Sequence, residues 1–139
     1  MTIDLNKYQE FVAEVTSNES KHNYAFLERI DALSGYQEDK THVNIALLIT
    51  AGMGLSAESG EFNEIIKKML FQGKPLNAEN LFHMKRELGD VIWYWANACT
   101  ALGLDPNDVI SENVNKLKAR YPGGEFSAQY SENRQQGDI

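Results

Sequence analysis

Two acidic pairs lie inside apolar segments of this chain, one in AESGEFNE at 57–64 and the other in RELGDVIW at 86–93. Glu58 and Glu61 form the first pair, and Glu87 and Asp90 form the second, each with a spacing of three residues. Residues three apart lie on the same face of an α-helix, so each pair points in one direction. An unpaired buried carboxylate is destabilising, and neighbouring carboxylates repel each other. A fold that places these acids in an apolar seam must therefore bring a cation to them.

Apolar residues recur at helical spacing along most of the chain, and no segment alternates in the manner of a β-strand. Gly73 and Pro75 end one long helix, while Asp105 followed by Pro106 is a typical helix start. The predicted helices cover about 4–16, 23–33, 43–71, 79–102 and 106–121. We therefore expect an all-α bundle of four to five helices, completed by oligomerisation.

The length of 139 residues suits a single domain, which we place at 1–122, followed by a polar C-terminal tail at 123–139. A net charge of −7, with no basic run longer than Lys67 and Lys68, argues against binding to nucleic acid. No apolar segment is long enough to span a bilayer, and the single Cys99 cannot form an internal disulfide. We expect a cytoplasmic protein that binds neither nucleic acid nor membrane.

Antiparallel packing through a turn at 72–78 would let the two acidic pairs face each other. Four carboxylates around one cavity are the ligands that Mg²⁺ or Mn²⁺ prefers. A single pair at this spacing is usually a solvated helix face, and two pairs on consecutive helices leave both interpretations open. A di-iron site usually needs a histidine three residues after a glutamate, and Glu58, Glu61 and Glu87 lack one.

Three other sequence features concern candidate residues for substrate binding or catalysis. Asn113, Lys116 and Arg120 share one stripe of the last predicted helix and could reach phosphate oxygens, although such a stripe is ordinarily a solvated basic face. Tyr94 lies one turn after Asp90 and is better placed for a ligand than for the core. The histidines are far apart in sequence and receive no catalytic role.

Two apolar features concern packing. The seam of the 79–102 helix is expected at Leu88, Val91, Trp95 and Leu102, so Trp95 is assigned to the core. The glycines inside the 43–71 helix weaken it and indicate close helix approach or a bend; they are Gly52, Gly54 and Gly60.

Three segments together resemble the MazG-like, all-α nucleoside triphosphate pyrophosphohydrolases, particularly the short single-domain forms of phages and bacteria. These segments are GLSAESGEFNEIIKKMLFQGKPL, ELGDVIWYWANACTALGLDPNDV and ENVNKLKARYPGGEFS. They follow the family's order of an ExxE helix, an ExxD helix and an N..K...RYP helix, over about 47–127. The first forty residues resemble the family only loosely.

The resemblance implies hydrolysis of a nucleoside triphosphate to the monophosphate and pyrophosphate, with dCTP or dGTP as expected substrates. It implies Mg²⁺, or Mn²⁺ as a substitute, held by four catalytic acids: Glu58, Glu61, Glu87 and Asp90. It also implies a substrate-binding role for Trp93, Tyr94, Asn113, Lys116, Arg120 and Tyr121. For a phage-encoded member, the expected compartment is the host cytoplasm.

Two other functions stay open: cleavage of phosphoribosyl-ATP, as in related histidine-pathway hydrolases, and a non-enzymatic helical oligomerisation module. Apolar residues on more than one helix face predict a homodimer or homotetramer, as the resemblance also implies. These residues are Phe62, Ile66, Ile92, Trp93 and Trp95.

Overall fold

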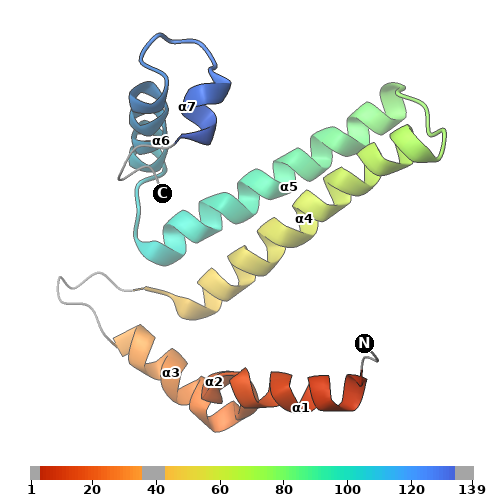
Figure 1. Cartoon of the computed structure of the whole chain (residues 1–139). Helices are drawn as coiled ribbons and strands as arrows, with labels where there is room; N and C mark the ends of the chain where they lie inside the picture. Colours follow the sequence, from red (N-terminus) through yellow and green to blue (C-terminus); the bar gives the residue numbers. More distant parts are fainter. Residues whose placement is uncertain (1–3, 36–42, 134–139) are drawn as a thin grey trace.

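The computed structural model of the chain describes residues 4–35 and 43–133, which form seven helices and no strand (Figure 1). The helices are α1 (Leu5–Val15), α2 (Asn18–Lys21), α3 (Asn23–Gly35), α4 (Ile45–Phe71), α5 (Ala78–Leu102), α6 (Pro106–Arg120) and α7 (Ala128–Glu132). The prediction of an all-α fold is confirmed. Its five helices correspond to α1, α3, α4, α5 and α6, whereas the short α2 and α7 were not predicted.

The centre of the molecule is an antiparallel hairpin of α4 and α5, which pack along their lengths (Figure 1). Its interior uses small side chains, because Ala51, Ala101 and Cys99 are buried together with Ile65. At the open end, the backbone N–H of Asn44 donates to the carbonyl of Ala101 at 2.8 Å. This bond ties the beginning of α4 to the end of α5.

The turn between the two helices is fixed by backbone conformation and by a buried amide. Gly73 has a φ of 69°, in the left-handed region that favours glycine. Asn80 is only 4% exposed, and its Nδ2 donates to the carbonyl of Pro75 at 2.6 Å. The side-chain oxygen of Asn77 accepts from the backbone N–H of Asn80 at 3.0 Å and caps α5. The turn therefore has a defined shape.

Close helix approach is confirmed at one of the three glycines of α4. A Cβ on Gly54 would lie 2.2–2.4 Å from ring atoms of Tyr94, so this aromatic ring lies directly against the α4 backbone. Among the described residues, a Cβ on Gly52 or Gly60 would meet nothing within 4 Å. The close approach is therefore local to the Gly54–Tyr94 contact.

The predicted seam of α5 is partly wrong. Val91 and Trp95 are half-buried as expected, but Leu88 and Leu102 are exposed. The side that meets α4 instead carries Tyr94, whose ring lies directly against Gly54. The absence of a side chain at Gly54 allows this close approach.

The helices outside the hairpin contribute little buried surface. None of the residues of α1, α2, α6 or α7 is buried. Figure 1 shows α3 beside the beginning of α4, and α6 with α7 beyond the end of α5. Among the described residues, no helix combines the length and apolar character needed to cross a bilayer. The short α7 lies in the segment predicted as a polar tail, and the boundary at 122/123 stays a prediction.

Candidate functional site

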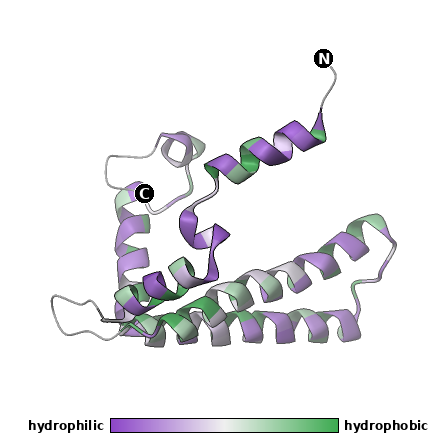
Figure 2. Cartoon of the chain, turned by 90° about the horizontal axis from the view of Figure 1, so that it is seen from below, coloured by the Kyte–Doolittle hydropathy of each residue, from purple (hydrophilic) through white to green (hydrophobic). Residues whose placement is uncertain are grey.

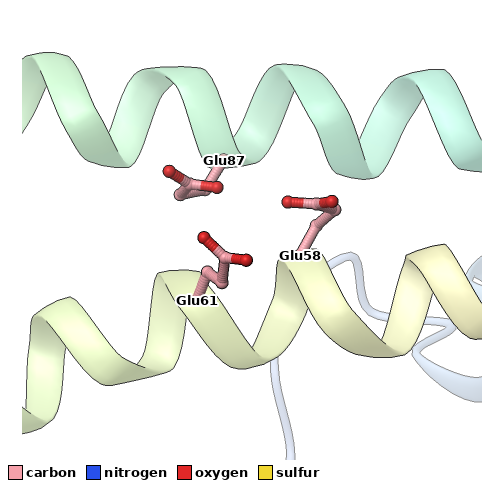
Figure 3. Close-up of side chains that lie close together, drawn as sticks. All are labelled: Glu58, Glu61 and Glu87. Carbon is pink, nitrogen blue, oxygen red and sulfur yellow. The ribbon is translucent and has the colours of Figure 1, made fainter.

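Three of the four predicted acids come together in the middle of the hairpin. Glu58 and Glu61 project from α4 and Glu87 projects from α5, so that their carboxylates face one another (Figure 3). One oxygen of each carboxylate lies within 4.8 Å of the others. Glu58 and Glu87 are half-buried and Glu61 is exposed. The expected meeting of the two acidic helices is thus observed for these three residues, which we call the acid cluster.

Several carboxylates lie close together in the acid cluster, and this crowding affects the pKa of Glu58. Partial burial raises the pKa of Glu58 above its ordinary value, and the charges of Glu61, Asp90 and Glu87 raise it further. A hydrogen bond between the carboxyl groups of Glu58 and Glu87 acts in the same direction, because it requires a proton on one of them. Asp90 is exposed and lies outside the cluster of three, but its charge still acts on Glu58.

The nearby lysines do not neutralise the acid cluster. Glu64 accepts ion pairs from both Lys67 and Lys68, and these lysines lower the pKa of the Glu64 carboxyl. Within residues 4–35 and 43–133, no lysine forms an ion pair with Glu58, Glu61 or Glu87. The cluster therefore offers several hard oxygen donors with uncompensated charge, a donor set that suits a divalent cation such as Mg²⁺ or Mn²⁺.

Two aromatic residues follow the acids on α5. The ring of Tyr94 packs against Gly54 and makes an edge contact with Trp93, with ring centroids 4.7 Å apart and planes at 81°. Trp93 is 58% exposed. Tyr94 thus has a packing partner within the chain, while Trp93 offers an open aromatic surface. Their roles in substrate binding stay predictions.

The residues of α6 do not join the acid cluster within one chain. Asn113 and Lys116 line a hollow of about 420 Å³ together with Trp95, and none of the four acids lines it. Leu102, where α5 ends before α6 begins, lies about 22 Å along the helix axis from Glu87, at about 1.5 Å per residue. Trp95, assigned to the core from the sequence, is half-buried and shares this hollow.

The end of α6 is occupied by local packing. The ring of Tyr121 lies 5.9 Å from that of Phe126, and both line a hollow of about 300 Å³ that includes Leu117 and Lys118. Arg120 is half-buried. The predicted phosphate-binding roles of Arg120 and Tyr121 are therefore not observed in a single chain, and they stay predictions.

The family model of the MazG nucleotide pyrophosphohydrolase domain matches residues 49–124, more than half of the chain. The chain belongs to the MazG family. The matched segment begins inside α4 and contains all ten residues predicted for the site, whereas α1, α2 and α3 precede it.

The MazG chain is also similar to the Gene 37 protein of Mycobacterium phage L5, with 37% identity over 73 residues. The similarity covers 52% of this chain and 64% of the phage protein, so this chain spans less than two thirds of its relative. No solved structure matches the chain.

A hollow beside the acid cluster, which we call the turn hollow, was not predicted from the sequence. It has a volume of about 250 Å³ and is lined by charged side chains and Ile65; the charged residues are Glu61, Glu64, Lys68, Lys74, His83 and Glu87. The spacing of His83 and Glu87, four residues apart on α5, was the signal that could have indicated a shared face. The position of Lys74 depends on the shape of the turn and gives no such signal.

Proposed function

We propose that this MazG chain is a metal-dependent nucleoside triphosphate pyrophosphohydrolase that converts a triphosphate to a monophosphate and pyrophosphate. The observation that carries the proposal is the acid cluster, in which carboxylates from two helices meet within the segment that matches the family model. Deoxynucleotides such as dCTP and dGTP are the proposed substrates. We place the activity in the cytoplasm, or in the host cytoplasm if a phage encodes the chain.

Glu58, Glu61 and Glu87 are the proposed ligands of Mg²⁺, with Asp90 as the fourth and Mn²⁺ as a substitute. Support for this proposal comes from their hard oxygen donors, from the partial burial of Glu58 and Glu87 and from the raised pKa of Glu58. When bound, such an ion neutralises charge on a triphosphate and generates a nucleophilic water. The hairpin keeps the carboxylates converged, so their repulsion is opposed by the packing of α4 against α5.

The substrate would contact residues on both sides of the acids. Trp93 offers an exposed ring for a nucleobase, and Tyr94 lies beside it. Asn113, Lys116, Arg120 and Tyr121 are proposed to contact phosphates. Because the hollow of Asn113 and Lys116 is separate from the acids in one chain, we propose that a second copy brings α6 to the site.

A homodimer or homotetramer is the proposed functional unit. Ile92 is 61% exposed on α5, and Trp93 is exposed beside it. The apolar side chains of α1 are uncovered as well. Large apolar surfaces of this kind usually meet a partner.

The deciding experiment incubates the purified chain with Mg²⁺ and a panel of ribo- and deoxynucleoside triphosphates, and resolves the products by chromatography. We expect equal amounts of monophosphate and pyrophosphate, and no turnover after the metal is chelated. Release of nucleoside diphosphate and orthophosphate would contradict the proposal.

Phosphoribosyl-ATP belongs in the same panel, because faster turnover of this compound would favour the related hydrolase activity instead. A calorimetric titration with Mg²⁺ and a non-hydrolysable nucleotide covers the non-enzymatic alternative. Binding heat is expected from an enzyme, whereas an oligomerisation module would give none.

A further inference from the structure

The turn hollow lies between the acid cluster and the turn of the hairpin. Glu61 and Glu87 belong to both the cluster and the hollow, so a ligand bound to the acids can extend into it. Lys68, Lys74 and His83 also line the hollow, together with Glu64. The hollow therefore adds cationic groups beside the carboxylates of the cluster.

The backbone that carries Lys74 is held in place. Its N–H donates to the carbonyl of Lys68 at 3.1 Å, directly after Gly73 with its positive φ. The next residue, Pro75, accepts the buried amide of Asn80. Lys74 is thus presented by a fixed turn instead of a loose loop, and less conformational freedom is lost when it binds a ligand.

The charge of Lys74 is available to a ligand. Lys68 is already paired with Glu64, at 3.4 Å. Lys74 forms no ion pair in the part of the chain that the structure describes, and His83 lies only at the edge of ion-pair distance from Glu79, at 4.0 Å. A compact ammonium group beside an imidazole suits a phosphate group.

The order of residues along α5 places His83 and the aromatic residues on opposite sides of Glu87. His83 lies one turn before Glu87, about 6 Å along the axis towards the turn of the hairpin. Tyr94 lies about 10 Å from Glu87 in the opposite direction. The acids therefore separate a basic end from an aromatic end.

We propose that Lys74 and His83 form a phosphate subsite for the pyrophosphate end of a metal-bound triphosphate, with the nucleoside directed towards Trp93 and Tyr94. This inference rests on the proposed function, since it assigns an orientation to the substrate of the same site. It adds two substrate-contacting residues, which the turn and α5 supply without a second copy of the chain.

The test measures two dissociation constants by calorimetry in the presence of Mg²⁺, one for inorganic pyrophosphate and one for a nucleoside monophosphate. Lys74→Ala and His83→Asn should each weaken pyrophosphate binding by about tenfold and leave monophosphate binding unchanged. Lys74→Arg should retain pyrophosphate binding because it keeps the charge. Lys85→Ala is the matched control, since Lys85 is an exposed lysine of α5 outside the hollow.

Two outcomes would overturn the inference. Pyrophosphate binding in Lys74→Ala that equals that of Lys85→Ala would show that the hollow holds no phosphate. Weakened monophosphate binding alone would show that the nucleoside end occupies it. The substrate panel tests the proposed function separately. If the chain hydrolyses triphosphates but Lys74→Ala does not weaken pyrophosphate binding, only the inference fails. If pyrophosphate binding depends on Lys74 but no triphosphate is hydrolysed, only the enzyme proposal fails.

Discussion

The α4–α5 hairpin and helix α1 are both amphipathic, yet the chain covers only one of them. Ile65 of α4 is 9% exposed, and Ala51 and Ala101 are fully buried between the two long helices. On α1, Phe11 is 56% exposed and Val15 is 67% exposed. Figure 2 shows hydrophobic stretches among hydrophilic ones along this helix, which begins next to the N-terminus. The hairpin thus obtains its packing from within the chain, whereas α1 presents an apolar side that none of the described residues covers.

The acid cluster and the apolar side of α1 therefore depend on different contacts. The acids lie on the self-contained element, so their convergence requires only α4, α5 and the turn. The apolar side of α1 needs another surface, and the exposed residues of α5 offer one on a second copy. The convergence of the acids and the assembly of the chain are therefore expected to respond to different mutations.

The largest effect is expected from removing charge at the acids. Glu58→Gln or Asp90→Asn should lower turnover by about 100-fold or more, since even outer partners of metal ligands typically contribute about 10–100-fold. The helical fold should be retained, as measured by circular dichroism. Glu10→Gln, which makes the same change on α1, is the control and should leave turnover unchanged. Wild-type activity in Glu58→Gln would contradict the ligand assignment.

The packing of the hairpin can be tested at two glycines of α4. Gly54→Ala should destabilise the protein by about 1–3 kcal/mol, because its new methyl group overlaps the ring of Tyr94. Gly52→Ala meets no neighbour in the described part of the chain and should stabilise the helix by about 0.5–1 kcal/mol. Urea unfolding measures both. Equal effects would mean that the contact between Gly54 and Tyr94 does not hold the helices together.

The uncovered side of α1 can be tested by placing a charge on it. Phe11→Asp should weaken self-association by about tenfold or more, as measured by sedimentation at several concentrations, because a buried aromatic residue is lost from the interface. Gln9→Asp puts the same charge on the polar side of α1 and should have little effect. A fully active wild-type species with the 15.7 kDa mass of one chain would contradict the proposed oligomer.

The smallest effect concerns the pH dependence of stability in the metal-free protein. The pKa of Glu58 is raised above 4.5 in the folded state. Between pH 4.5 and this raised pKa, the folded protein holds a proton that the unfolded chain has released, so stability falls as the pH rises through this interval. Glu58→Gln should therefore be more stable than the wild type above pH 4.5 and equal to it below. Urea unfolding with a chelator present measures this difference.

Glu64→Gln provides the control of opposite sign. The pKa of Glu64 is lowered by Lys67 and Lys68, so its ionised form stabilises the fold above pH 4.5, and this stability is lost as the pH falls through the lowered pKa. Glu64→Gln should be less stable than the wild type above pH 4.5. An advantage of Glu58→Gln that does not change with pH would refute the proposed repulsion.

The long helices could be predicted because their signals are local. The range 43–71 predicted for α4 is observed as Ile45–Phe71, with Asn44 as its N-cap. The acid cluster could be predicted because two spacings of three residues and one antiparallel turn nearly determine it. Both results depend on neighbours in sequence or on the simplest connection between two helices.

The rest depends on contacts that spacing does not encode. Apolar residues surround much of α5, so periodicity could not tell that the Tyr94 side meets α4 while Leu88 is exposed. The relation of α6 to the acids depends on packing beyond the hairpin. Lys74 and His83 come together only once the turn has its observed shape, which the buried Asn80 fixes.

The bond from Asn80 to Pro75 also sets a rule for insertions and deletions. It fixes where α5 begins, so one residue added to α4 between Glu61 and the turn would rotate both acids of α4 by about 100° and move them by about 1.5 Å. The carboxylates of α4 and α5 would stay opposite one another only if a whole helical turn were added to both helices. Among relatives that retain the acids, hairpin length should therefore vary in steps of about seven residues, divided equally between the two helices.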